Sequence, residues 1–462
     1  MSYNNPSSLL QLAIQSLLRD DNLTITSLKH LPAEVFPSLF LEAHIHRRRE
    51  TLKALVQTWP FERLPLGALL KMDSLRIFKA VMDGIDVLLK QEVPHSRCKL
   101  RVLDLQFTGQ KFWRMWTGTS QVFRKEKTVD DLQGTRRQPY FEVCVDLYIS
   151  KPDRLSNYLL DWIRERKGVH LSCKTVMIYS LTRKSFRFLH AMPFCDIKEL
   201  GIHCTLTFST LRLLGIQLGM MNNLKRLDVC IDILCNHPDD WMPVCISEFT
   251  SAFHQLLHLQ ELYLKSPFFL QGHLHQLIRS LATPLEVFSL TNCRVTEGDL
   301  THLFQSPHIT HLKDLCLRGL PLTSVSEPLR ALLEVNAATL QHLDLGLCGL
   351  QDPQLEALLP ALSSCSQLSS LSLHGNRLSM ATLEKLLRCT SGLSRLRQEI
   401  YPAPMETFNP QGILQPQTFD LLCTHIFKIL KELKHSRSIV VSTGRCSYCA
   451  RKMFRNWKLH CC

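Results

Sequence analysis

Apolar positions recur along the chain in one repeated pattern. A core of the form L-x-x-apolar-x-apolar opens six segments, which begin at Leu224, Leu259, Leu285, Leu312, Leu340 and Leu368 and are therefore spaced by 35, 26, 27, 28 and 28 residues. Looser copies of this core begin at Leu100, Tyr140, Cys173 and Ile197. Within each core, apolar and polar residues alternate with the period of two that buries one face of a β-strand. The pattern therefore predicts a long series of short strands.

Helical periodicity fills the intervals between these cores. In the stretch 352–365, Asp352 can cap a helix and Pro353 fits its first position. The leucines that share one face of this helix are Leu355, Leu358, Leu359 and Leu362. Strand, turn, helix and return at this spacing are typical of the longer leucine-rich repeats, in which neighbouring units bury each other's cores. The predicted fold class is α/β, a leucine-rich-repeat horseshoe (solenoid) with a parallel inner sheet.

The eighth position after the first leucine holds a small polar side chain in three segments, at Cys293, Cys348 and Asn376. A side chain of this kind can form hydrogen bonds with the backbone as it turns after the strand. Leu320 occupies the same position in the segment that begins at Leu312, so a different turn is expected there.

Both ends of a solenoid need caps, because terminal repeats would otherwise expose apolar surface. We expect an N-terminal helical cap at 1–96, the solenoid at 97–440 with inserts near 109–138 and 235–243, and a cysteine-containing tail at 441–462. The apolar face of the first helix, capped by Ser7 or Ser8, would comprise Leu9, Leu10, Ala13, Ile14, Leu17 and Leu18. Further helices are expected at 48–57 and 75–90.

The stretch "LPAEVFPSLF" at 31–40 indicates another helix start, with Pro32 at the first helical position and Pro37 as a kink inside the helix. After Arg397, a proline-rich stretch indicates an extended crossing segment. An amphipathic helix from Phe419 to Leu433 and a last strand at 438–443 would then close the stack.

The larger insert, at 109–138, carries Trp113 and Trp116 among basic residues. An exposed loop of aromatic and basic side chains is a candidate contact surface. The alternative is that both tryptophans pack on the first repeat, since large aromatic side chains are usually buried.

Composition narrows the class of protein. The N-terminus lacks the features of a secretory signal and no run of 18 apolar residues occurs, so we expect residence in the cytoplasm and nucleus and no membrane contact. There, the 18 cysteines should stay reduced and serve as small core residues. We find no phosphate-binding loop, dinucleotide fingerprint, H-E-x-x-H or G-x-S-x-G, and therefore expect an adaptor without its own active site rather than an enzyme.

The net charge of +13 could serve nucleic acid or an acidic protein partner. A dispersed, solvated surface is the preferred interpretation, because no nucleic-acid-binding motif accompanies the charge.

The tail holds the one candidate metal site, with a C-x-x-C followed after ten residues by His-Cys-Cys. Its ligands would be drawn from Cys446, Cys449, His460, Cys461 and Cys462. Thiolates and imidazole at such spacing can form a tetrahedral structural zinc site, and a tail without metal is the alternative. No other cofactor is expected.

Several stretches outside the repeat core are more specific than the repeat itself. They are "QSLLRDDNLTI", "LPAEVFPSLFLEA", "TLKALVQTWPFERLPLGAL", "FKAVMDGIDVLL", "FWRMWTG", "YPAPMETF" and the C-x-x-C tail. In these stretches the chain resembles the PRAME family of leucine-rich-repeat proteins. The resemblance implies a horseshoe fold and work as the substrate-recognition subunit of a cullin 2 ubiquitin ligase, joined through elongins B and C. It also implies links to the germline or early embryo, to negative regulation of transcription, to differentiation and to the regulation of apoptosis.

The same resemblance implies two docking boxes. The elongin box would be formed by Ser16, Leu17, Asp21 and Ile25, with Asp21 in place of the usual Cys. A charged group costs several kcal/mol in an apolar pocket unless it stays at the rim. The cullin box would be formed by Leu31, Pro32, Val35 and Leu39, and all four fit its form.

On this reading, the horseshoe would hold a protein substrate for ubiquitination, and the basic charge of the chain would favour an acidic one. The alternative reading is a non-ligase scaffold that acts as a transcriptional corepressor, and binding to nucleic acid ranks after both.

Overall fold

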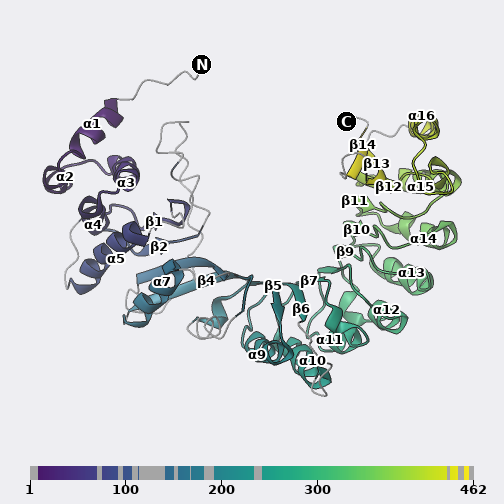
Figure 1. Ribbon diagram of the computed structural model, residues 1–462, viewed down its shortest axis with the longest axis horizontal. Coiled ribbons are helices and arrows are strands. Elements are labelled where there is room, and N and C mark those ends of the chain that lie inside the picture. The colour runs from purple at the N-terminus through teal and green to yellow at the C-terminus, as the bar shows by residue number, and fades with distance from the viewer. Residues whose placement is uncertain are drawn as a thin grey trace. The chain divides into compact units, whose positions relative to one another are not determined.

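The computed structural model (Figure 1) divides into two compact units. Unit 1 comprises Met1–Val176 and Thr182–Pro193, and unit 2 comprises Met177–Leu181 and Phe194–Cys462. The residues that the structure describes are 9–69, 75–91, 97–106, 113, 141–149, 154–166, 168–181, 192–233, 242–433, 438–445 and 452–456.

Unit 1 begins with helices, as the sequence predicts for a cap. These are α1 (Leu9–Leu17), α2 (Asp21–Ser27), α3 (Val35–Ile45), α4 (Arg49–Gln57), α5 (Leu75–Lys90) and, later in the chain, α7 (Arg154–Arg164), with a short 3-10 helix η1 (Gly67–Leu69). Its strands are β1 (Arg63–Pro65), β2 (Val102–Asp104), β3 (Phe141–Ile149) and β4 (Val169–Ile178), whose last two residues are counted with unit 2. Strand β2 pairs in parallel with both β1 and β3. The sheet thus starts inside the predicted helical cap, ahead of residue 97.

Aromatic packing forms the core of unit 1 around Trp59, which is fully buried. Its ring meets Phe36 and Phe40 edge to face, with ring centroids 6.4 and 5.4 Å apart. The indole N–H donates to the carbonyl of Arg63 at 3.1 Å. Buried aromatic groups with a satisfied N–H fix α3 and α4 against the first strand.

Unit 2 is built from regular repeats. Its strands are β5 (Glu199–Leu206), β6 (Arg226–Ile233), β7 (Glu261–Lys265), β8 (Val287–Thr291), β9 (Asp314–Cys316), β10 (His342–Asp344), β11 (Ser370–Ser372), β12 (Gln398–Pro402), β13 (Ser438–Arg445) and β14 (Lys452–Asn456). Its helices are α9 (Phe208–Leu218), α10 (Met242–Ser251), α11 (Leu274–Arg279), α12 (Glu297–Phe304), α13 (Ser326–Val335), α14 (Asp352–Ser364), α15 (Met380–Ser391) and α16 (Pro416–Glu432). Short 3-10 helices are η3 (Phe194–Asp196), η4 (Ala252–Gln255), η5 (Phe268–Leu270), η6 (Pro307–Ile309) and η7 (Met405–Thr407).

The strands of unit 2 pair in chain order. Each strand from β5 to β12 is parallel to the next, and β14 returns antiparallel on β13. Figure 1 shows these strands on the inner side of the curve of unit 2, with the helices on its outer side. Every predicted strand core is confirmed, and the fold is a leucine-rich-repeat solenoid with a parallel sheet. Strands β1, β12 and β14 were not predicted.

The repeat turn works as the sequence predicts. Asn376 is buried, its side-chain N–H groups donate to the carbonyls of Leu345 and Leu373, and its carbonyl accepts the N–H groups of Cys348 and Leu350. The thiol of Cys348 donates to the carbonyl of Leu317 at 3.1 Å. Burial raises the pKa of Cys348 to about 12, which keeps this thiol protonated and able to donate.

Two helices start differently from the prediction. Helix α3 begins at Val35, so Pro32 precedes the helix and does not occupy its first position. Pro37 lies in the first turn, where its missing N–H costs nothing, and not at an interior kink. Helix α14 is capped by Gln351, and the carboxylate of Asp352 instead accepts the N–H of Ser379 in the next repeat. None of the described helices combines the length and the apolar character that crossing a membrane requires.

Candidate functional site

The surface of α1 and α2 in unit 1 exposes large apolar side chains. Leu9, Leu12 and Leu23 are 86%, 51% and 53% exposed. Only Ile14 and Leu18 of the predicted apolar face are buried, since this face packs on the rest of unit 1 at these two positions. The remaining leucines are therefore available to a partner.

The predicted elongin box lies at this surface. Ser16 is exposed, and Leu17 and Ile25 are half-buried. Asp21, the first residue of α2, is half-buried, and its carboxylate accepts the hydroxyl of Thr51 on α4 at 2.8 Å. The charge that replaces the usual cysteine thus has a partner inside unit 1.

The predicted cullin box is split between surface and core. Pro32 is exposed, whereas Leu31 and Val35 are half-buried. Leu39 is fully buried in α3, so it holds this helix in place and presents no surface of its own.

A distant residue holds the linker that enters this box. The guanidinium of Arg97 donates from Nη1 to the carbonyls of Leu28 and Leu31, at 3.2 and 3.1 Å. Charge-assisted hydrogen bonds to two carbonyls fix the path of the backbone between α2 and α3.

Trp113 is 5% exposed, which supports the packed alternative for this side chain. Its ring stacks on Phe40, with centroids 5.7 Å apart, and its N–H donates to the carbonyl of Pro65. Trp116 and the rest of the insert at 114–138 lie outside the described residues.

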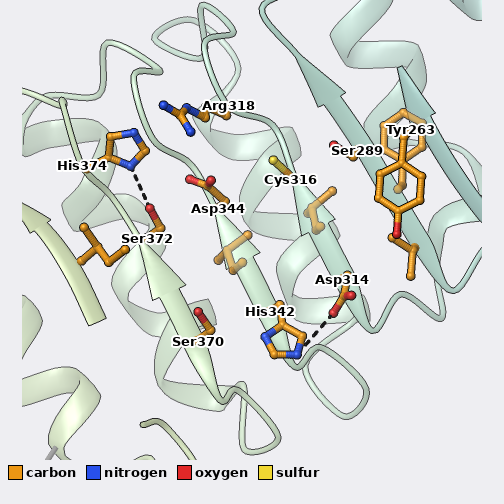
Figure 2. A pocket seen from close by; sticks show the side chains of 15 residues that line it. Tyr263, Ser289, Asp314, Cys316, Arg318, His342, Asp344, Ser370, Ser372 and His374 are labelled. Carbon is orange, nitrogen blue, oxygen red and sulfur yellow. Dashed lines mark hydrogen bonds and ion pairs between the residues drawn. The ribbon is translucent and has the colours of Figure 1, made fainter. Parts of the chain in front are cut away.

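A second candidate site is a hollow of about 510 Å³ on the strand face of unit 2 (Figure 2). Its polar lining comes from successive strands β7 to β11 and from the residues just after them: Tyr263, Ser289, Asp314, Cys316, Arg318, His342, Asp344, Ser370, Ser372 and His374. Parallel register places Tyr263, Ser289, Cys316, Asp344 and Ser372 in one row across the sheet. A one-residue shift in any strand would turn these side chains into the core.

One edge of the hollow is closed by a network around Glu261. Its carboxylate accepts the hydroxyl of Tyr263 at 3.0 Å and pairs with Arg226 at 3.2 Å. The guanidinium of Arg226 also lies 4.5 Å from the centre of the Tyr263 ring. Burial, followed by the hydrogen bond to Glu261, raises the pKa of Tyr263 to about 12, so its hydroxyl remains a donor at neutral pH.

At the opposite edge, His374 is 9% exposed, and its Nδ1 lies 2.9 Å from the hydroxyl of Ser372. Gly346 makes room for this ring, because a Cβ there would lie 2.2 Å from the imidazole. Glycine at this position therefore leaves the space that the His374 ring occupies beside Ser372 (Figure 2).

The predicted zinc ligands Cys446, Cys449, His460, Cys461 and Cys462 lie outside the described residues, so zinc in the tail stays a prediction. In the part of the chain that is described, histidine, cysteine and carboxylate side chains do not group in threes as a metal site requires.

Comparison with known proteins places the whole chain in one family. The profile of the PRAME N-terminal domain matches residues 6–113, and that of the PRAME C-terminal domain matches residues 141–462. The chain belongs to the PRAME family. Human PRAME family member 12 is 43% identical over 459 residues, which cover 97% of this chain and 95% of the human protein. Human PRAME family member 20 is 38% identical over 475 residues, and the alignment covers 100% of both chains.

Among solved structures, an internalin of Listeria monocytogenes matches 56% of this chain and 80% of its own, at 16% identity and a TM-score of 0.28. The assignment of this PRAME chain to the leucine-rich-repeat solenoids rests on its own strands and helices.

Sequence reasoning did not single out the residues of the hollow in this PRAME chain. Asp314, His342 and Asp344 are ordinary polar residues at alternating positions of separate repeats. Their shared feature is the same outward-facing register on neighbouring strands, and a search for polar residues at those repeat positions could have found them.

Proposed function

We propose that this PRAME family chain is a non-catalytic substrate-recognition subunit of a cullin 2 ubiquitin ligase. Unit 1 would bind elongin C, and with it elongin B, through Leu17 and Ile25, and would approach cullin 2 through Leu31, Pro32 and Val35. Unit 2 would hold the protein to be ubiquitinated. Roles in differentiation, apoptosis and transcription, in cytoplasm and nucleus, would follow from the loss of that substrate.

The observation that carries the proposal is the exposure of leucines on α1 and α2 around the elongin box, in a chain of this family. Leu9 at 86% and Leu23 at 53% exposed are large apolar groups that a protein partner would cover. Leu17 lies between these two leucines in the sequence, Ile25 follows Leu23 by two residues, and both Leu17 and Ile25 keep part of their surface accessible.

The proposed mechanism is positional. A receptor that binds the ligase with one unit and the substrate with the other raises the concentration of substrate near the ubiquitin-conjugating enzyme. Such a protein needs no nucleophile, general base or metal of its own, and the expectation of an adaptor without an active site is part of this proposal.

Capture of ligase subunits by the purified full chain tests the proposal. The wild type should retain elongin C and cullin 2, and Leu17→Ser should reduce retention of elongin C at least about tenfold, since a buried leucine contributes about 1.5–3 kcal/mol. Leu421→Ser is the matched control, because Leu421 is 72% exposed on α16 in unit 2. Wild-type protein that captures neither subunit would contradict the proposal.

A specific observation favours the second candidate, a non-ligase scaffold that acts as a transcriptional corepressor. The carboxylate of Asp21 is engaged by Thr51, and its charge opposes entry into an apolar pocket of elongin C. Asp21→Cys separates the two functions. The scaffold is the better description if three results are obtained together. The wild type binds neither elongin C nor cullin 2, the Asp21→Cys variant binds both, and both proteins retain their nuclear partners.

A further inference from the structure

The hollow of unit 2 exists because several neighbouring strands carry small side chains on the same face. Ser289, Cys316 and Ser372 stand in one row, with the larger Tyr263 at one end and Ile400 at the other. Leucine and phenylalanine side chains from the alternate positions form the floor beneath them. The hollow, called the recess from here on, has a volume of about 510 Å³ and is open to one face of the sheet. It is wide enough for side chains of a docked segment.

Two carboxylates of this recess, those of Asp314 and Asp344, differ from the other acidic groups of the same sheet face in the partners that they have. On β6 and β7, Asp228 lies 3.9 Å from Lys265, and Glu261 lies 3.2 Å from Arg226. These acidic groups already have cationic partners.

The carboxylates in the recess are paired differently. Asp314 has the imidazole of His342 at 3.7 Å (Figure 2). Asp344 accepts the backbone N–H of Gly346 at 2.8 Å. Among the described residues, no lysine or arginine nitrogen lies within ion-pair distance of either carboxylate. Arg318, the one arginine in the described lining of the recess, forms no ion pair with Asp314 or Asp344. The nearby Lys313 is engaged by Glu286 at 2.7 Å.

The environment of Asp314 adds to this argument. Burial raises the pKa of Asp314, the charge of Glu261 raises it further, and the opposing effects of His342 and Lys313 do not cancel them. A carboxylate in this situation is incompletely compensated, and a cation brought by a ligand would stabilise its charged form.

We propose that the recess binds an extended segment of a partner protein that carries lysine or arginine, with one cationic group held between Asp314 and Asp344. The two residues lie on neighbouring strands, two register positions apart, which places them roughly 7–8 Å from each other. A guanidinium between two carboxylates makes charge-assisted hydrogen bonds to both. The inference rests on the proposed function only in that the segment would belong to the recruited substrate.

This partner has the opposite charge to the one that the net charge of +13 favours. The difference follows from distance, because charges farther away than about 8 Å are largely screened at physiological ionic strength. A docked segment therefore responds mainly to the charges that line the recess, Asp314, Asp344 and Arg318, and less to the basic residues elsewhere on the chain.

The test uses the full chain and a fluorescein-labelled peptide of alternating arginine, glycine and serine, followed by fluorescence anisotropy. A second peptide with glutamate in place of arginine serves as the probe of opposite charge. The wild type should bind the arginine peptide with an affinity that falls as salt increases, and should not bind the glutamate peptide. Asp314→Asn with Asp344→Asn should weaken binding at least about tenfold, as expected when two close charge pairs are lost.

The matched control is Asp161→Asn with Glu327→Gln, which changes the net charge equally at side chains that are 70% and 64% exposed on α7 and α13. This control should keep wild-type affinity, and both double variants should keep the wild-type urea midpoint. Absence of binding by the wild type, an equal loss in the control, or preference for the glutamate peptide would each overturn the inference.

Parallel capture of elongin C and cullin 2 separates this inference from the proposed function. Wild-type protein that captures both subunits but ignores the arginine peptide overturns the inference alone. Wild-type protein that binds the peptide through Asp314 and Asp344 but captures neither subunit overturns the ligase proposal and leaves the recess in place.

Discussion

At the scale of single residues, Asn376 is the position on which a repeat turn depends most. Its amide makes four hydrogen bonds to backbone groups of two neighbouring repeats. Removing it leaves these groups buried without partners. We predict that Asn376→Ala lowers the free energy of unfolding by roughly 3 kcal/mol or more, measured as a shift of the urea midpoint.

The control for this prediction is Asn223→Ala. Asn223 is exposed and donates one hydrogen bond, to the carbonyl of Cys195 at 2.8 Å. Its loss should cost at most about 1 kcal/mol. Equal shifts of the midpoint in both variants would show that the turn does not depend on the amide.

One residue also explains why sequence reasoning missed β12. Glu399 stands in register with Leu371 on β11 and with Ile439 on β13, at a position where the other repeats place an apolar side chain. It is fully buried, and its carboxylate accepts the hydroxyls of Thr390 and Tyr401. A buried acid with partners breaks the apolar pattern that reveals the other strands, and only the folded repeat supplies those partners.

At the scale of elements, the path from α2 to α3 depends on Arg97. Its two hydrogen bonds hold the backbone at Leu28, between the two docking boxes, and at Leu31, the first residue of the cullin box. If the ligase proposal holds, Arg97→Ala should reduce capture of cullin 2 about tenfold and leave capture of elongin C unchanged, because α1 and α2 keep their own packing. The measurement is parallel retention of both subunits on the immobilised chain.

Arg101→Ala is the matched control for Arg97→Ala. Arg101 is an exposed arginine four residues later, and its loss changes the net charge equally. It should leave both subunits bound. A parallel loss of elongin C and cullin 2 in Arg97→Ala would instead indicate general disruption of unit 1.

The two candidate sites differ in how far the sequence could reveal them. The docking boxes are local, so their residues lie within a few turns of one another and could be named from the chain alone. Which of these residues are exposed could not be predicted from the chain alone. The burial of Leu39 and the pairing of Asp21 with Thr51 depend on α4 and the core of unit 1. The recess joins residues from separate repeats, and its position depends on strand register, which the periodicity of the leucines implies but does not locate.

At the scale of the whole molecule, a solenoid is stable only when its terminal repeats are covered. In unit 2 this cover is α16 with β13 and β14. Strand β13 pairs along the edge of β12, and α16 buries one apolar face. The residues of this face are Phe419, Cys423, Ile426, Ile429 and Leu430. Without the cover, β12 would present an unpaired edge, which favours pairing with other chains.

We predict that a chain ending at Gln415 unfolds at lower urea concentration than the full chain and forms soluble aggregates. Loss of the apolar face of α16 removes on the order of 10 kcal/mol of burial as an upper bound, and the unpaired edge of β12 adds a route to association. Circular dichroism during urea unfolding and size-exclusion chromatography measure the two effects.

The full chain with Leu421→Ala is the control for this prediction. Leu421 is exposed on the opposite side of α16, so its substitution should leave the urea midpoint and the elution volume unchanged. An unchanged urea midpoint in the shortened chain would mean that the repeats up to β12 are stable without a cap. Stability in unit 2 would then come from the repeats themselves, and α16 would be available for a different role.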